Sequence, residues 1–225
     1  SDIEERMNLL NIYAMTIDPN DNSMPWVEEA VPPTPLLSQA AIGLGFANIK
    51  PDSDNVNRKV PLIVKYKGMY YPSIDLLLVM HFYGISKKDV EIKVGQYIKL
   101  SNIPKEKMVK ATHDNSINIP IDAEGFMDIN FIGGPGSFTH YPYYYFCRDG
   151  KITNTSLQDK IILVAAYSST GISTDIHKSP YGDLFGIEHH ANALNTILNQ
   201  DFIVKLTPFQ NILILFAIAI LLGFI

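Results

Sequence analysis

The sequence has a single cysteine among its 225 residues and no excess of basic side chains. One thiol, that of Cys147, cannot close a disulfide within the chain or supply the several thiolates of a structural zinc site. Eighteen Lys and Arg stand against 23 Asp and Glu, which gives a net charge of −5, and the basic residues are scattered along the chain. Because nucleic-acid phosphates are bound by clustered basic side chains, we expect no nucleic-acid partner.

Signatures of common catalytic and cofactor-binding sites are also missing. There is no GxSxG motif that would mark a serine nucleophile. The glycine-rich loop Gly133–Gly136 does not continue into GxGxxG or GK[ST]. Its Pro135 lacks the N–H group that such loops use to hold phosphate. We therefore predict a tight turn at this loop and no cofactor.

A second incomplete motif lies at residues 51–58, which read PDSDNVNR. Asp52 and Asp54 occupy the first and third positions of a calcium-binding loop, but the oxygen ligand, the glycine and the final glutamate that should follow are absent. The alternatives are a metal site and a structural turn in which the two carboxylates accept backbone N–H groups and pair with Arg58. We favour the structural turn and predict no metal.

What the chain does contain is the composition of one globular domain, with 47% hydrophobic residues and 14 each of Gly and Pro. Ser73 and Gly84 bracket the segment IDLLLVMHFY, which is apolar almost all round. Serine is a preferred residue at the start of a helix and glycine just past its end. We therefore predict a capped, buried helix between these two residues.

Several segments have the pattern of β-strands. Residues 60–66 and 69–71 flank a Lys-Gly pair, as expected of a hairpin. The apolar run from Asp159 to Tyr167 is typical of a central strand that is covered on both faces. We therefore predict a single α/β domain with a mixed central sheet flanked by helices, with residues 161–165 near the centre of the sheet.

The C-terminal segment, residues 209–225, reads FQNILILFAIAILLGFI and contains no charged residue. Its uninterrupted apolar part begins at Ile212 and corresponds to about 21 Å of helix, whereas a hydrocarbon core is roughly 30 Å thick. We expect residues 209–225 to be the truncated start of a transmembrane helix in contact with lipid; the alternative is a buried core helix. Residues 1–17 resemble the end of an amphipathic helix running into a strand, so we expect both ends of the chain to be truncated.

One dense set of potential ligands follows the predicted central strand and comprises Asp175, His177, Glu188, His189 and His190. Ligands in open α/β sheets gather at the carboxyl ends of strands. The spacing is not that of a zinc motif, because adjacent His189 and His190 diverge by about 100° on a helix. The alternatives are a ligand or catalytic role and a hydrogen-bonded core or interface histidine, and we favour the second.

From this set and the neighbouring Asn192 we predict a ligand-binding or signal-transmitting site with Asp175, His177, His190 and Asn192. In it, Asp175, His190 and Asn192 form one polar cluster that links the loop after the strand to the following helix. We predict that the cluster is structural or signal-transmitting and that none of its residues is catalytic.

Several segments, in their order, resemble the CHASE2 domain, an extracytoplasmic sensor module of bacterial transmembrane receptors. The matching segments are Gly45–Asn48, Asp52–Arg58, Val60–Leu62, Tyr71–Ser73, Ile129–Phe131, Asp159–Val164, Asp175, Ser179–Pro180 and Gly186–Asn192. The resemblance runs from about residue 9 to the end of the chain. Asn55 stands where the family usually has Gly, and His189 where it usually has an aliphatic residue, which leaves the shape of this loop and of this helix start open.

The resemblance implies that residues 1–205 are a sensor domain lacking its N-terminal portion, on the extracytoplasmic (periplasmic) side of a bacterial cell membrane. It also implies a cytoplasmic effector, most often an adenylate or guanylate cyclase, a protein kinase or a diguanylate cyclase. We expect a non-catalytic homodimeric sensor of an unknown small-molecule or protein stimulus. The alternatives are a membrane-tethered metal-dependent hydrolase that uses Asp175, His177 and His190, and a structural domain that only dimerises the receptor.

Overall fold

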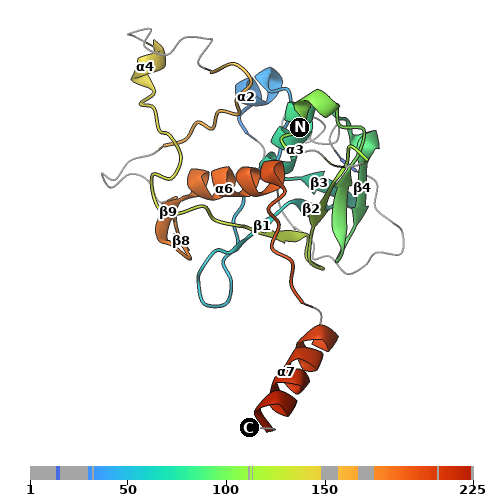
Figure 1. The fold of residues 1–225 in the computed structure, drawn as a ribbon. Helices are drawn as coiled ribbons and strands as arrows, with labels where there is room; N and C mark the ends of the chain where they lie inside the picture. The colour runs from blue at the N-terminus through green and yellow to red at the C-terminus, as the bar shows by residue number, and fades with distance from the viewer. Residues whose placement is uncertain are drawn as a thin grey trace.

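The computed structural model describes residues 14–15, 30–31, 33–110, 112, 114–147, 157–166, 175–206 and 208–223. The described helices are α2 (Pro35–Ala40), α3 (Ile74–Tyr83), α4 (Tyr144–Cys147), α6 (Gly186–Asn199) and α7 (Pro208–Gly223), with 3₁₀ turns η1 (Lys87–Asp89) and η2 (Lys105–Lys107). The described strands are β1 (Lys59–Pro61), β2 (Ile63–Tyr66), β3 (Met69–Pro72), β4 (Val90–Lys93), β5 (Tyr97–Leu100), β6 (Ile117–Pro120), β7 (Phe126–Asp128), β8 (Ile176–Ser179) and β9 (Gly182–Phe185). Figure 1 shows α3 and α6 among the small sheets and α7 apart from them.

The described strands form small antiparallel sheets that pair β1 with β7, β2 with β3, β4 with β5 and β6, and β8 with β9. Short turns explain much of this pairing, because a chain that reverses at Lys67 and Gly68 brings β2 and β3 together in opposite directions. Within the described part of the chain, parallel pairing is limited to an isolated bridge between Phe46 and Ser73. The predicted α/β class is confirmed, but the predicted mixed central sheet is wrong for the described strands.

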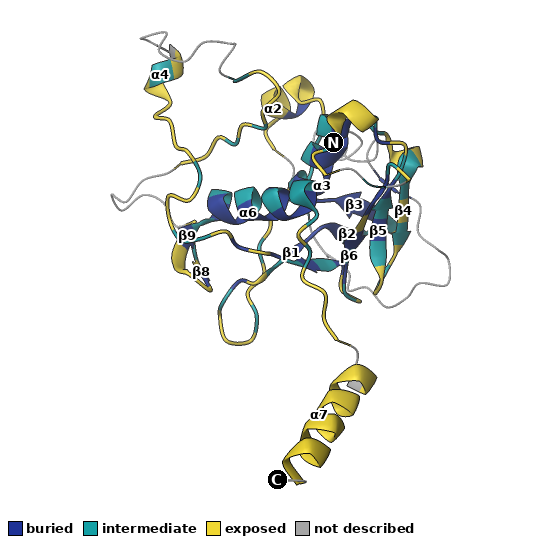
Figure 2. Cartoon of the chain, in the orientation of Figure 1, coloured by how far each residue is buried: buried dark blue, intermediate teal, exposed yellow. Residues whose placement is uncertain are grey.

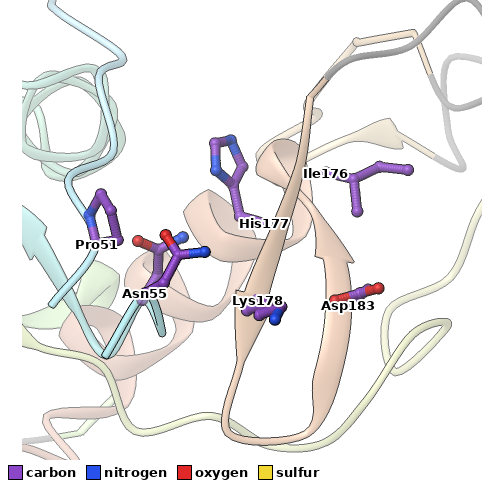
Figure 3. A pocket seen from close by; sticks show the side chains of 7 residues that line it. Pro51, Asn55, Ile176, His177, Lys178 and Asp183 are labelled. Carbon is purple, nitrogen blue, oxygen red and sulfur yellow. The ribbon is translucent and has the colours of Figure 1, made fainter. Parts of the chain in front are cut away.

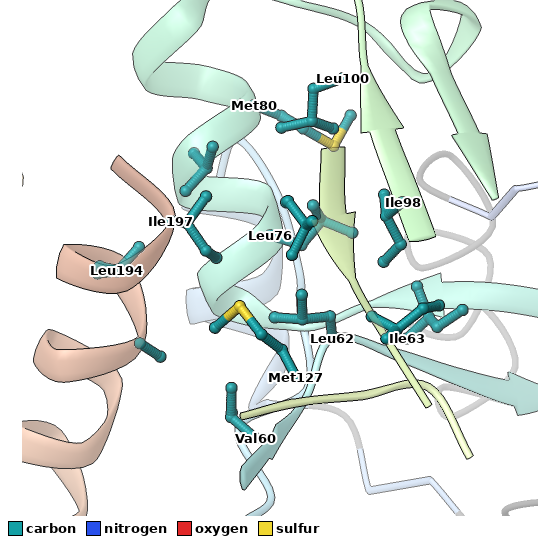
Figure 4. Close-up of a cluster of buried hydrophobic side chains, with 14 of the residues drawn as sticks. Val60, Leu62, Ile63, Leu76, Met80, Ile98, Leu100, Met127, Leu194 and Ile197 are labelled. Atoms are coloured by element: carbon teal, nitrogen blue, oxygen red, sulfur yellow. The ribbon is translucent and has the colours of Figure 1, made fainter. Parts of the chain in front are cut away.

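Helix α3 has the limits and the burial that its sequence predicts. The Ser73 hydroxyl accepts a hydrogen bond from the Leu76 N–H at 3.1 Å, and Gly84 ends the helix with a φ of 70°. A left-handed residue at this position suits glycine, which has no Cβ to clash with the backbone. The helix packs against β3 and α6, and Figure 4 shows Leu76 and Met80 meeting side chains from β2, β5 and α6 in the core.

Residues 161–165 do not form the predicted central strand. No described strand pairs with them, and residues 161–164 alternate between two environments. Ile161 and Leu163 pack against the core, whereas Ile162 and Val164 are 46% and 73% exposed. An unbroken apolar run predicts cover on both faces, and the described residues cover only one of them.

Little of the predicted N-terminal helix and strand falls within the described residues. Met15 pairs with Tyr70 of β3 in an isolated antiparallel bridge, with N–O distances of 2.8 and 3.2 Å. Residues 1–13 and 16–29 lie outside the described residues, as does the part of the predicted loop between residues 167 and 174.

Helix α7 is an apolar helix whose residues from 209 to 223 are exposed along the whole length (Figure 2). It contains no acidic or basic residue in its first and last turns. Nowhere in the described part of the chain is a helix both long and apolar enough to span a bilayer. The predicted transmembrane start is therefore not confirmed and stays a prediction.

Candidate functional site

The hairpin of β8 and β9 leads directly into α6, and Asp175 lies at this junction. The Gly186 N–H donates to the Asp175 carbonyl oxygen at 3.0 Å. A Cβ at Gly186 would collide with both oxygens of the Asp175 carboxylate, so only glycine lets this carboxylate approach so closely. The first turn of a helix has free N–H groups and a partial positive charge, which favour a carboxylate at this place.

His177 stands two residues further along and contacts the same carboxylate. Its Nε2 atom lies 2.9 Å from Oδ1 of Asp175. The Asp175 side chain is more than half exposed and that of His177 about one third, so solvent screens the pair. The structure thus brings together two of the four predicted site residues.

His190 pairs with Asp75 of α3, a residue that the sequence analysis did not select. Its Nδ1 atom lies 2.9 and 3.1 Å from the two carboxylate oxygens. Asp75 is completely buried and the His190 side chain is 12% exposed. A signal was present in the sequence, because Asp75 is the only carboxylate in the otherwise apolar helix IDLLLVMHFY. A buried charge in such a helix requires a partner.

The pKa values of this pair follow from burial and from the contact itself. Burial raises the pKa of Asp75, and the hydrogen bond from His190 opposes that rise only in part. Burial is the largest single influence on His190 and alone would lower its pKa, but the hydrogen bond to Asp75, the charge of that carboxylate and a backbone hydrogen bond at Ala47 together raise the pKa. The imidazole therefore ties α6 to both α3 and the segment before β1 through a retained proton.

Asn192 faces a different part of the molecule. Its Oδ1 atom accepts a hydrogen bond from the Ile132 N–H at 3.0 Å, and its amide donates to the Glu188 carbonyl at 2.8 Å. Side chains two positions apart on a helix point in directions about 200° apart, so Asn192 and His190 point to different sides of α6. No hydrogen bond between described residues joins His190 to Asp175 or Asn192. The predicted set is thus divided among three contacts.

Glu188 belongs with Asn192 and holds the glycine-rich loop against α6. Its carboxylate accepts the Gly136 N–H at 2.9 Å and the Phe185 N–H at 3.3 Å, which caps the helix. Thr196, one turn after Asn192, accepts the Asn130 N–H at 3.1 Å. Spacings of four residues place these three side chains on one face of α6, where they bind the backbone of residues 130–136.

His189 is buried with both ring nitrogens lacking a hydrogen-bond partner among the described residues. Burial lowers its pKa to about 4, with further lowering from the neighbouring His177 and His190. Its ring meets those of Phe131 and His177 edge to face, at centroid distances of 5.5 and 5.8 Å. The imidazole is therefore neutral and packs as an apolar side chain, in the position where the family usually has an aliphatic residue.

The turn at residues 52–58 has the contacts expected of a structural turn. Arg58 donates to Asp54 at 2.7 and 2.9 Å and to Asp52 at 3.2 Å. The Val56 N–H donates to the Asp54 carboxylate at 3.2 Å. The hydrogen bond from Arg58 lowers the pKa of Asp54 to about 2. The carboxylates are thus engaged by the protein's own donors, and the absence of any other role for them stays a prediction.

Asp75, Asp175, His177, His189 and His190 together form what we call the α6 site. Across the described ranges of the chain, no three His, Cys, Asp or Glu side chains are placed to hold a metal ion. The arrangement offers a buried ion pair between two helices, an exposed pair at a helix start, and a neutral imidazole between them. Such an arrangement can couple the β8–β9 hairpin to the packing of α6 on α3.

A protein-family model described as the CHASE2 domain matches residues 4–225. Neither the curated proteins nor the solved structures contain a match to this chain.

Proposed function

Because the chain belongs to the CHASE2 family of extracytoplasmic sensor domains, we propose that it senses a stimulus outside a bacterial membrane and passes it to a cytoplasmic effector. In this proposal residues 1–205 are the sensor domain and residues 209–225 begin the first transmembrane helix. The effector is an adenylate or guanylate cyclase, and the receptor is a homodimer. The charge-free sequence of α7 and its exposed apolar surface support the membrane assignment.

The observation that carries the proposal is the buried contact between Asp75 and His190. A stimulus can shift a receptor only if it binds two arrangements of the domain with different affinity. A buried ion pair between two helices offers such arrangements, because it is either formed or lost. Helix α6 carries one partner and is the last helix before α7, so a change in its packing reaches the C-terminal segment directly.

The connection between α6 and α7 is held to the domain by exposed ion pairs. Lys205 lies 2.7 Å from Asp128 at the end of β7, and Asp201 lies 3.5 Å from Lys110. Asn130 also donates to the Asp201 carbonyl at 3.1 Å. Residues 201–206 are therefore tethered at two places, so that movement of α6 is transmitted to α7 and not taken up by a loose linker.

The test is to measure cyclase activity of the full-length receptor with Asp75→Asn or His190→Gln. We expect either change to shift the basal activity by about fivefold or more, which is the range of ordinary coupling between sites. Glu124→Gln is the matched control, because it removes an exposed ion pair with Lys50 that includes no residue of the α6 site. Variants that fold, as judged by thermal unfolding, and leave the activity unchanged would contradict the proposal.

A further inference from the structure

A small cavity lies between the 51–57 loop and the β8–β9 hairpin, next to the α6 site. Its volume is about 270 Å³, and Figure 3 shows Pro51 and Asn55 on the loop opposite the hairpin that carries His177. The Asn57 N–H donates to the Lys178 carbonyl at 2.8 Å, which holds the loop and the hairpin together. The lining residues are Pro51, Asn55, Asn57, Ile176, His177, Lys178 and Asp183.

Asn57 is the feature that distinguishes this cavity from an ordinary surface hollow. The residue is 2% exposed, and its Oδ1 atom has no hydrogen-bond partner in the part of the chain that the structure describes. Leaving a buried polar atom unpaired destabilises a fold, so such atoms usually have a partner in the protein or in bound water. The Asn57 oxygen has almost no accessible surface, so the amide must turn toward the cavity before an N–H or O–H group of a ligand can donate to it.

Two opposite charges stand side by side on the hairpin. Lys178 and Asp183 are direct cross-strand partners, which places their Cβ atoms roughly 5 Å apart on one face. Both side chains are exposed, and among the described residues neither takes part in an ion pair. The cavity thus offers one ammonium group and one carboxylate, with the amide oxygen of Asn57 buried in its wall.

From this combination we propose that the cavity binds a free α-amino acid as the stimulus of the sensor, an inference that rests on the proposed function. The ligand's carboxylate pairs with Lys178, its ammonium group pairs with Asp183, and an N–H group of the ligand donates to Asn57. At roughly 30 Å³ per water, a volume of about 270 Å³ corresponds to about nine waters, or a ligand of about nine heavy atoms. Asparagine and glutamine fit this size and carry the extra N–H donor.

The cavity is placed so that its occupant acts on α6. His177 lines the cavity, contacts the Asp175 carboxylate at the start of α6, and meets the buried ring of His189. A ligand that orders the hairpin therefore acts on the helix that also carries His190. This links the cavity to the ion pair that supports the proposed function.

The experiment is isothermal titration calorimetry on the full 225-residue chain in detergent, with L-asparagine, L-glutamine, L-glutamate and L-leucine as probes. We expect at least one of them to bind with a Kd below about 1 mM. Asp183→Asn and Lys178→Met should each weaken that binding by about tenfold or more, because each removes a charge-assisted contact. Glutaramic acid, which is glutamine without its ammonium group, should bind the unmodified chain less tightly than glutamine does. The two compounds should bind the Asp183→Asn chain equally well.

The matched control is another cross-strand pair of opposite charges, the exposed Glu91 on β4 and the half-buried Lys99 on β5. Glu91→Gln and Lys99→Met should leave the Kd within about twofold. The assignment is overturned if none of the four amino acids binds below about 1 mM, if binding survives both hairpin substitutions, or if D-glucose binds and the amino acids do not.

The outcome for the ligand can be separated from the outcome for the function. Amino-acid binding together with a cyclase that ignores the Asp75→Asn and His190→Gln changes would overturn the proposed function and leave the ligand assignment standing. A cyclase controlled by that pair, in a chain that binds no amino acid, would overturn the ligand assignment alone.

Discussion

The Nδ1 atom of His190 lies 2.9 Å from the Asp75 carboxylate, although 115 positions separate the two residues along the chain. The contact joins the first turn of α3 to the second turn of α6 in the interior of the domain. Both partners have a raised pKa, so the pair retains a proton that exposed groups of the same kinds would release sooner. Its stability and its pH dependence are therefore measurable properties of the helix packing.

Removing one partner of this pair should destabilise the domain strongly. His190→Ala leaves the Asp75 carboxylate buried without its hydrogen-bond donor, and we expect the free energy of unfolding to fall by about 3 kcal/mol. His177→Ala removes an exposed contact to Asp175 and should change it by less than about 1 kcal/mol. Urea denaturation of the two variants measures both values, and equal losses would contradict the buried pair.

The same pair should weaken in alkali. The pKa of His190 is raised in the folded protein. Its contribution to the free energy of unfolding is therefore fully present below the pKa of the unfolded chain, about 6.5. The contribution is lost as the pH rises through the folded pKa, where the imidazole gives up its proton. Thermal unfolding from pH 6 to 10 should show a decline in the unmodified chain that His190→Gln reduces. An identical decline in both chains would count against the pair.

His189 should make the domain sensitive to acid. Its pKa is lowered to about 4, so between about pH 6.5 and 4 the unfolded chain binds a proton that the folded chain does not. The free energy of unfolding should therefore fall as the pH falls through this window, by up to about 3 kcal/mol at 1.36 kcal/mol per pKa unit. His189→Leu, which restores the family's aliphatic residue, should flatten this decline in urea-denaturation series. A steeper decline in the variant would contradict the neutral buried imidazole.

Gly45 should tolerate no side chain. A Cβ at this position would lie 2.6 Å from the Ile74 nitrogen and 2.8 Å from two further backbone atoms of Ser73 and Ile74. Because helix α3 begins there, neither side can move freely, and Gly45→Ala should destabilise the domain by about 2 kcal/mol or more. Gly134→Ala is the control, since its Cβ would meet its nearest neighbour at an ordinary 3.5 Å. Similar melting temperatures for the two variants would show that the close approach is not needed.

The proposed topology can be tested in whole cells. Lys87 is exposed in η1, so Lys87→Cys in a Cys147→Ser background provides one accessible thiol. A membrane-impermeant maleimide should label this thiol in intact cells with a permeabilised outer membrane. Labelling that requires lysis of the inner membrane would place the domain in the cytoplasm and remove the extracytoplasmic assignment. The Cys147→Ser chain without the new cysteine measures the background.

Features that depend on neighbouring residues follow from the sequence by itself. The start of α3 at Ser73 and its end at Gly84 need only a hydroxyl next to free N–H groups and a residue that accepts a positive φ. The hairpin at Lys67 and Gly68 and the pairing of Arg58 with Asp52 and Asp54 are likewise short-range. The order of such local segments also carries the family resemblance, which the match over residues 4–225 confirms.

Only the tertiary structure decides which distant groups meet. The apolar run at residues 161–165 does not show by itself that the side chains of Ile162 and Val164 are exposed among the described residues. Whether a face is buried depends on residues from other parts of the chain. The sequence analysis placed His190 and Asn192 in one polar cluster, but the helix directs His190 to Asp75 and Asn192 to the Ile132 backbone. The unpaired Asn57 oxygen arises in the same way, since the packing of a loop on a hairpin removes water from this group and leaves Lys178 and Asp183 exposed at the same cavity.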